Sequence, residues 1–247
     1  MAFPAGVVFD LDDTLHDTAG IEAETLVSLC AAVREQWPDA DARTFIARYR
    51  DGRDELYLRV LRGEWDIATY RRAHLAATCE PWGEPTETLF ATQQRLRDEQ
   101  LERARFLEHA TDLLRELREA GVRTALLTNG PSWMQRRKVQ ALGLESQLDA
   151  IAISEELGVA KPDPAAFAAA LELIDVAAGE TVMVGDHLDW DVRGALDAGL
   201  CGAVWVAGDD DREPPAGAVR VVGLDEVPAA LAALAPPSAP GSGGRRP

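Results

Sequence analysis

Lysine is scarce in this sequence. Of the 25 basic residues only Lys138 and Lys161 are lysines, against 42 aspartates and glutamates. The formal net charge of −17 repels nucleic-acid phosphates and anionic lipid headgroups, so we expect neither a nucleic-acid nor a membrane-surface partner. Cysteine is also rare: Cys30, Cys79 and Cys201 form no CxxC pair. This spacing argues against a disulfide framework or a cysteine zinc site and indicates a reducing compartment.

Long apolar segments are missing as well. No run approaches the roughly 20 apolar residues that a membrane-spanning helix needs. Residues 1–4 lack the basic segment followed by an apolar one that marks a secretory signal. We therefore expect a cytoplasmic protein. At 247 residues with 47% hydrophobic and 27% charged, the chain has the composition of a folded protein with one large domain or two unequal ones.

Short apolar runs that end in polar residues predict the strands of a buried parallel sheet. They lie at 6–9, 124–127, 151–154 and 181–184, and more peripheral strands are expected at 202–206 and 219–222. Helical patterns lie between them, one of them with Asp163 as N-cap before Pro164. This alternation predicts an α/β fold with a doubly wound, Rossmann-like parallel sheet, in which chemistry collects at the carboxyl ends of the strands.

Residues 15–96 interrupt the alternation, because they show helical patterns and no strand. An apolar stripe of this segment includes Leu26, Cys30 and Val33. We predict a helical cap domain over 15–96, inserted into a core formed by 1–14 and 97–235. Residues 236–247, rich in Pro, Gly and Ser, are predicted to be a disordered tail.

Two carboxylates, Asp10 and Asp12, follow the first predicted strand. Clustered carboxylates repel each other and are costly to desolvate unless they share a cation or a proton. A plain turn is the alternative explanation, because aspartate is common in turns.

Four separated motifs, in order, resemble those of the haloacid dehalogenase-like hydrolases, most of which are phosphatases. The first is DLDDT at 10–14, and the second is Thr128 at a strand end. The third is Lys161, followed by Pro162, and the fourth is GDHLDWD at 185–191. The resemblance covers the predicted core, while the helical segment matches the family's cap by position and helical character only.

The resemblance implies a phosphomonoester hydrolase that acts through an aspartyl-phosphate. Asp10 would attack phosphorus, and Asp12 would serve as general acid and then general base. Mg²⁺ would be held by the side chain of Asp10, the backbone carbonyl of Asp12 and the side chain of Asp186, because this cation prefers oxygen ligands. Asp191 would support the site, either at the metal through water or at Lys161.

The remaining site residues would bind the phosphoryl group. The Thr128 hydroxyl, with backbone N–H groups near Asn129 and Gly130, would hold its oxygens. Lys161 would offset the negative charge of the phosphate and of the nucleophile. His16 and His187 lie near the motifs, but we assign them no role, since a lone histidine is more often an ordinary polar residue. We assign Asp189 to helix capping.

Other activities of the family fit less well. Asp12 argues against a haloacid dehalogenase, in which the second acid of the first motif is missing. A phosphonate hydrolase would need a cap lysine, and residues 15–96 contain none. A phosphosugar mutase and a catalytically idle binding or regulatory protein remain open as alternatives.

The expected partner is a small phosphate ester, either a sugar phosphate or a nucleoside monophosphate, because a helical cap suits a small ligand. The sequence gives no indication of the oligomeric state. Several cap arginines could select a second anionic or polar group on the substrate, among them Arg48, Arg50, Arg53, Arg59, Arg62, Arg71 and Arg72.

Overall fold

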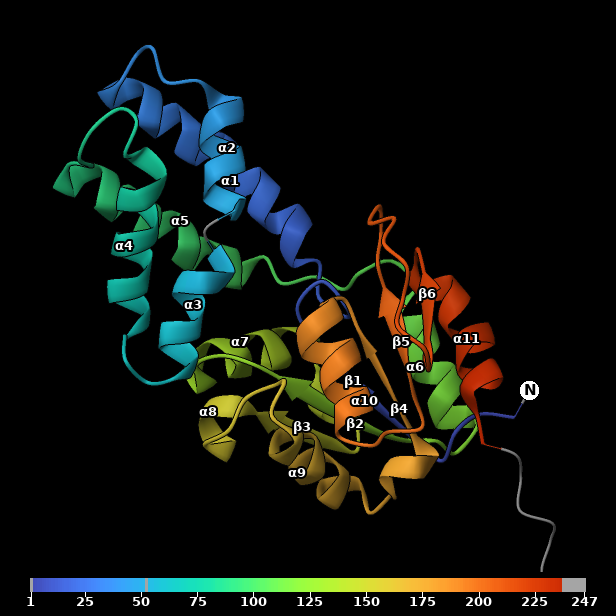
Figure 1. The fold of residues 1–247 in the computed structure, drawn as a ribbon. Helices are drawn as coiled ribbons and strands as arrows, with labels where there is room; N and C mark the ends of the chain where they lie inside the picture. The colour runs from blue at the N-terminus through green and yellow to red at the C-terminus, as the bar shows by residue number, and fades with distance from the viewer. Residues whose placement is uncertain (1, 52, 237–247) are drawn as a thin grey trace, which may run out of the picture.

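The computed structural model describes residues 2–51 and 53–236, which form two lobes joined by two chain crossings (Figure 1). Beyond Pro236, the tail predicted over 236–247 lies outside the described residues. None of the described helices is both long and apolar enough to cross a bilayer.

The larger lobe is built on a six-stranded sheet in the order β3-β2-β1-β4-β5-β6, with every neighbouring pair parallel. The predicted doubly wound parallel fold is thereby confirmed. Side chains of β1 and β4 are buried along their whole length, as their unbroken apolar runs indicate. The strands are β1 (Gly6–Phe9), β2 (Arg123–Thr128), β3 (Ala150–Ile153), β4 (Thr181–Gly185), β5 (Gly202–Val206) and β6 (Ala218–Val221).

Helices cover both faces of the sheet (Figure 1). Since successive strand side chains point to opposite faces, Val7 and Phe9 of β1 join one apolar core and Val8 joins the other. The first core is closed by α6 (Ala110–Glu119), α7 (Ser132–Leu142) and α11 (Val227–Leu234). The second is closed by α9 (Pro164–Ile174), α10 (Gly194–Asp197) and a π-helical turn, Leu188–Arg193. The shorter elements are α8 (Ser154–Leu157) and single 3₁₀ turns at Leu144–Ser146, Ala178–Glu180 and Leu224–Glu226.

Helix starts follow local capping chemistry. Asp163 accepts a hydrogen bond from the Ala165 N–H at the start of α9, as the sequence predicts. Pro164 occupies the first helical position, where its missing N–H costs nothing.

The described residues of the smaller lobe, the cap, form helices and connecting loops without a strand, and they have a core of their own that includes Leu29, Phe45, Leu75 and Leu89. Its helices are α1 (Thr18–Gln36), α2 (Ala42–Asp51), α3 (Arg53–Leu61), α4 (Ile67–Cys79) and α5 (Glu87–Glu102).

One sequence boundary in the cap differs from the structure. The boundary expected between residues 96 and 97 falls inside α5, which continues to Glu102 and buries Leu101. Leu101 lies about one helical turn beyond Leu96 and Arg97. Continuing the helix to Glu102 therefore buries a further apolar side chain.

The two crossings between cap and core run side by side. The Asp17 N–H donates to the Arg105 carbonyl, and the Leu107 N–H donates to the Leu15 carbonyl. Four residues from distant parts of the sequence thus form a short paired connection directly beyond the end of β1.

Candidate active site

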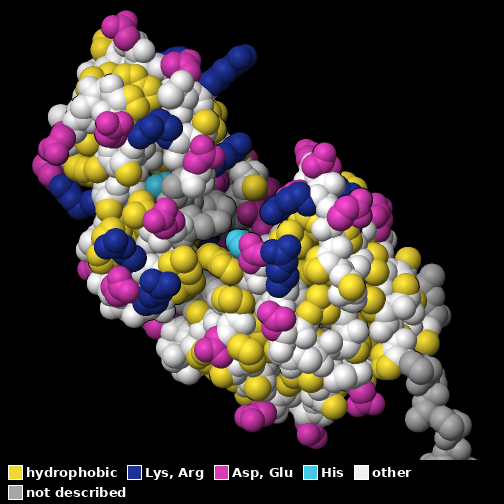
Figure 2. Space-filling model, in the orientation of Figure 1, with side chains coloured by type: hydrophobic (Ala, Val, Ile, Leu, Met, Phe, Trp, Pro, Cys, Tyr) yellow, Lys and Arg dark blue, Asp and Glu magenta, His cyan; other side chains and the backbone are white. Residues whose placement is uncertain are grey.

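The sequence-predicted polar residues meet at the carboxyl ends of three neighbouring strands. Asp10 follows β1, Thr128 ends β2, and Asp186 follows β4. All three line a cavity of about 230 Å³ between the core and the cap. Figure 2 shows the molecule hollowed between these two lobes. Parallel strand order alone therefore brings together residues that are up to 176 positions apart in the sequence.

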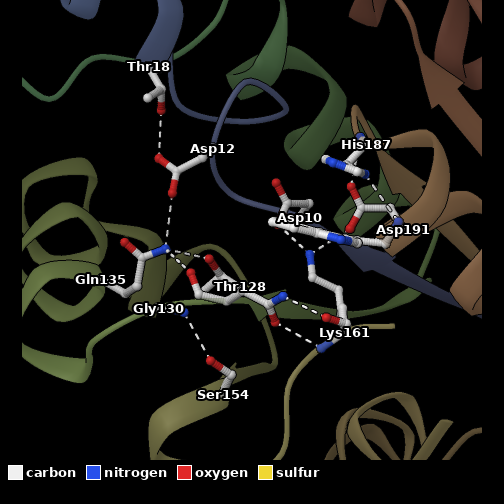
Figure 3. Close-up of polar contacts among 12 residues, drawn as sticks. Asp10, Asp12, Thr18, Thr128, Gly130, Gln135, Ser154, Lys161, His187 and Asp191 are labelled. Atoms are coloured by element: carbon white, nitrogen blue, oxygen red, sulfur yellow. Dashed lines mark hydrogen bonds and ion pairs between the residues drawn. The ribbon is translucent and has the colours of Figure 1, made fainter. Parts of the chain in front are cut away.

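Lys161 lies at the centre of this group. Its Nζ donates to Asp10 Oδ1 at 2.5 Å and to Asp191 Oδ1 at 2.6 Å (Figure 3). Lys161 is 3% exposed, and a buried ammonium needs such carboxylate partners. Of the two positions expected for Asp191, its contact with Lys161 is observed, and its other oxygen accepts from the His187 N–H at 2.9 Å.

Asp10, Asp186 and Asp191 form a compact acidic cluster, with one carboxylate oxygen from each within 4.8 Å of the others. Burial raises the pKa of Asp10 to about 7; Lys161 opposes this rise and Asp191 adds to it. Burial, followed by repulsion from Asp10 and Asp191, raises the pKa of Asp186 well above its usual value. These oxygens fit a hard divalent cation, because such an ion would offset the repulsion between the clustered carboxylates.

The glycine of the fourth motif makes room for this cluster. A Cβ at Gly185 would lie 2.5 Å from the side chain of Asp191. Any other residue at the end of β4 would therefore push Asp191 away from Lys161.

Asn129 fixes the segment that carries Lys161. Its Nδ2 donates to the Lys161 carbonyl and its Oδ1 accepts from the Lys161 N–H, both at 2.9 Å. The side chain thus ties the end of β2 to the Lys161 loop. The Gly130 N–H, expected to be available for a phosphoryl oxygen, instead donates to Ser154 Oγ at 2.9 Å (Figure 3). A buried N–H requires an acceptor, and α8 supplies one here.

The Thr128 hydroxyl belongs to a network that also holds Asp12. Gln135 Nε2 contacts Thr128 Oγ1 at 2.5 Å and Asp12 Oδ2 at 3.0 Å (Figure 3). Lys138, one turn later on α7, donates to both oxygens of Asp12 at 2.7 and 2.8 Å. The first motif and the helix after β2 are therefore joined by charged hydrogen bonds.

Asp12 has two further partners near the start of the cap. Thr18 Oγ1 donates to Asp12 Oδ1 at 2.6 Å, and His16 Nδ1 lies 3.2 Å from the same oxygen. Burial acts to raise the pKa of Asp12, but Lys138 and His16 hold it well below its usual value. The carboxylate is thus ionised in the protein as it stands.

Sequence reasoning missed Lys138, Gln135 and His16. Gln135 and Lys138 are spaced i, i+3, so they share one face of the helix after β2, and Lys138 is one of only two lysines. Both signals were available, but neither tells which way that helix face points. The assignment of His16 to no role overlooked its contact with Asp12.

The capping role assigned to Asp189 is wrong. His187 caps the π-helical turn, since its Nδ1 accepts from the N–H groups of Asp189 and Trp190. The carboxylate of Asp189 pairs with Arg193 at 2.6 Å on the surface. His187 also stacks on Trp190 at the cavity wall, with ring centroids 4.2 Å apart.

The cap supplies the opposite wall of the cavity. Among the arginines expected to select substrate, Arg71 lines it. Arg48 instead donates to two carbonyl groups at the end of α4, and Arg72 pairs with Glu87 on the surface. Arg97, which the sequence boundary assigned to the core, lines the cavity from α5.

Comparison with known proteins supports a single family. Residues 4–199 match the haloacid dehalogenase-like hydrolases. The chain is 29% identical over 215 residues to human N-acylneuraminate-9-phosphatase, covering 81% of both chains. It is 32% identical over 201 residues to ribulose-1,5-bisphosphate 5-phosphatase of Halopiger xanaduensis, covering 78% of this chain and 81% of the relative.

Solved structures agree in fold. The magnesium-bound HAD-hydrolase YfnB of Bacillus subtilis superimposes with a TM-score of 0.74 at 24% identity, covering 94% of this chain and 100% of YfnB. The family expected from the four motifs is confirmed: the chain belongs to the haloacid dehalogenase-like hydrolases.

Proposed function

We propose that this protein is a Mg²⁺-dependent phosphomonoester hydrolase acting on a small phosphorylated metabolite, a sugar phosphate or a nucleoside monophosphate. The supporting observation is Lys161, which contacts Asp10 and Asp191 at the edge of the sheet where Asp186 completes an acidic cluster. Relatives at 29–32% identity are phosphatases by name. The three free cysteines suit a reducing compartment, and we propose the cytoplasm.

Asp10 is the nucleophile in this proposal. Its carboxylate attacks phosphorus, so that an Asp10–phosphorus bond forms while the bond from phosphorus to the ester oxygen breaks. Asp12 gives a proton to the departing oxygen, which leaves as an alcohol. Asp12 then takes a proton from water as that water attacks phosphorus, which releases inorganic phosphate and restores Asp10.

The acidic cluster would hold the cation through Asp10 and Asp186, with the Asp12 carbonyl as the third protein ligand. A bound Mg²⁺ supplies positive charge that offsets repulsion between carboxylate and phosphate. Lys161 provides a fixed cation beside the nucleophile, and Asp191 and Asn129 keep Lys161 in place.

Binding of a phosphate dianion changes the balance at Asp12. Without substrate, Lys138 and His16 favour the ionised carboxylate. A doubly negative phosphoryl group held at Thr128 competes for Lys138 and disfavours a second negative charge nearby, so it favours the protonated acid that the first step needs. The cap, predicted over 15–96 and continued by α5 to Glu102, is the proposed lid that excludes bulk water during this step.

Hydrolysis of p-nitrophenyl phosphate by wild type and by Asp10→Asn, with Mg²⁺ and with EDTA, tests the proposal. We expect turnover only by metal-loaded wild type, because the amide is a poor nucleophile and a poor cation ligand. Asp189→Asn is the matched control: it makes the same isosteric change at an exposed residue of the fourth motif and should keep wild-type turnover.

Equal rates for wild type and Asp10→Asn would contradict Asp10 as the nucleophile, and full activity in EDTA would contradict the metal requirement. No turnover of any phosphate ester in a broad panel would favour the mutase or the binding-protein alternative.

A further inference from the structure

The cap side of the cavity carries a group of buried polar residues that the proposed chemistry does not use. We call Arg71, Gln93 and Arg97 the cap subsite. Arg71 comes from α4, and Gln93 and Arg97 lie one turn apart on α5. All three line the cavity together with the catalytic residues of the core. A ligand that fills the cavity therefore meets the core at one end and the cap subsite at the other.

Gln93 has an unsatisfied hydrogen-bond donor. The residue is 2% exposed, and its Nε2 has no partner among the described residues. A buried donor without an acceptor is costly, so such groups in a cavity wall indicate a missing partner. Since Nε2 is a donor, the missing partner is an acceptor oxygen.

The two arginines of the cap subsite differ in how well neighbouring acidic residues balance their positive charge. Arg97 Nη2 donates to Glu22 at 2.9 Å and to the Tyr49 hydroxyl, and Glu22 is itself buried. Arg71 is 5% exposed, but its partner Asp98, at 3.3 Å, is half exposed to solvent. Water screens Asp98 and weakens its effect on the buried guanidinium.

The direction of the Arg71 pKa agrees with this imbalance. Burial, and then repulsion from Arg97, lower the pKa of Arg71, although Asp98 acts in the opposite direction. An additional negative charge at this point would stabilise both arginines. Only the charge of Arg71 lacks a full counter-charge. A ligand group with a single negative charge therefore fits the cap subsite better than a second phosphate group with two.

We propose that the cap subsite binds a carboxylate on the leaving group, so that the substrate is the phosphomonoester of a hydroxy acid or sugar acid. This inference rests on the proposed function, because it places the phosphate at Asp10. The carboxylate accepts hydrogen bonds from Arg71 and Gln93, while Arg97 adds positive charge. Tyr49, Tyr70 and Ile67 supply apolar surface around it.

A matched ligand pair tests the proposal. 6-Phosphogluconate and sorbitol 6-phosphate differ only at the end remote from phosphate, where one has a carboxylate and the other a hydroxymethyl group. We expect wild type to prefer the acid by about tenfold to a hundredfold in kcat/KM, the range of one or two charge-assisted hydrogen bonds. A ratio within about twofold, or a preference for the polyol, would overturn the proposal.

A measurement of ligand affinity tests the cap subsite independently of whether the proposed hydrolysis takes place. The same two ligands are titrated calorimetrically into Asp12→Asn with Mg²⁺, which lacks the proposed general acid but keeps the carboxylates of Asp10 and Asp186 that would hold the cation. Tighter binding of the acid supports the cap subsite even if wild type hydrolyses nothing. Equal affinity overturns the cap subsite even if wild type hydrolyses p-nitrophenyl phosphate.

Gln93→Glu tests the residues directly, because it places a carboxylate where the ligand's carboxylate would lie. We expect the acid-to-polyol ratio to fall to about two or less, since like charges now meet. Ala91→Glu adds the same charge to the exposed side of α5 and should keep the wild-type ratio. Arg71→Gln, which removes the cation, should lower the ratio in the same way; an unchanged ratio in both cap-subsite variants would overturn the assignment.

Discussion

Lys138 Nζ holds both carboxylate oxygens of Asp12, at 2.7 and 2.8 Å. Lys138 is nearly buried, while Asp12 keeps about a third of its side chain exposed to the cavity. The contact joins α7 of the core to the loop that leads into the cap. It fixes the direction of the carboxylate and sets its charge in the absence of substrate.

Replacing this lysine should therefore impair the acid–base step. We expect Lys138→Met to lower kcat for p-nitrophenyl phosphate by about tenfold to a hundredfold, since a misplaced general acid loses part of its usual contribution. Arg137→Met is the matched control, because Arg137 is exposed and its nearest acidic partner, Glu102, is 3.6 Å away. Steady-state kinetics compare the two variants, and equal activity would rule out a role for Lys138.

The metal-free protein should lose stability as the pH rises. Asp10 has a pKa of about 7 in the folded protein against 3.8 as its ordinary value, so the folded state binds this proton more tightly than the unfolded state. The stabilisation is present at low pH and is lost as pH rises towards and through 7, by up to about 1.4 kcal/mol per pH unit for each proton. The raised pKa of Asp186 acts in the same direction.

Thermal denaturation in EDTA between pH 5 and 8 measures this effect. We expect the Tm of wild type to fall across that range, and Mg²⁺ to reduce the fall because it replaces the protons. Asp10→Asn should show a shallower slope in EDTA, as it lacks the titrating group. Parallel slopes for the two proteins would show that Asp10 does not titrate there.

The sequence predicted the parts of the site that depend on strand ends. Asp10, Thr128 and Asp186 follow buried apolar runs, and the ends of parallel strands meet at one edge whatever the details of packing. Lys138 could not be placed in this way, because its contact with Asp12 depends on how α7 rotates against the sheet. The cap boundary moved for a similar reason, since burial of Leu101 by tertiary packing extends α5.

Asn129 should affect both stability and activity, because its side chain holds the loop that carries Lys161. Asn129→Ala removes both hydrogen bonds to the Lys161 backbone, and we expect a loss of about 1–3 kcal/mol in the free energy of unfolding. The activity should fall as well, because the Lys161 loop is less constrained. Urea denaturation measures the first effect. Thr92→Ala, which removes a hydrogen bond on the surface of α5, should change stability by less than about 0.5 kcal/mol. Equal stability of both variants would contradict the role assigned to Asn129.

Gly130 lies where the cap approaches the core. Its φ is 138°, and an added Cβ would lie 2.8 Å from the hydroxyl of Tyr57 on α3. Gly130→Ala therefore combines backbone strain with crowding of the Tyr57 hydroxyl, and we expect kcat/KM for p-nitrophenyl phosphate to fall at least about tenfold, chiefly because a φ of 138° strains any residue with a Cβ in the loop after Thr128. Gly121→Ala gives the cost of a milder strain without crowding, because its φ of 75° is closer to the left-handed region that other residues adopt and nothing lies within 4 Å of the added atom.

The clash can be separated from other effects by a double-mutant cycle with Tyr57→Phe, which removes the clashing hydroxyl. If the cap is displaced through this contact, Tyr57→Phe should restore part of the activity of Gly130→Ala, so the two changes are not additive. Kinetics of the four proteins, with Tm as a check on folding, measure the coupling. Additive losses would show that Gly130→Ala acts only within the core loop, and that the approach of α3 to Gly130 has no part in turnover.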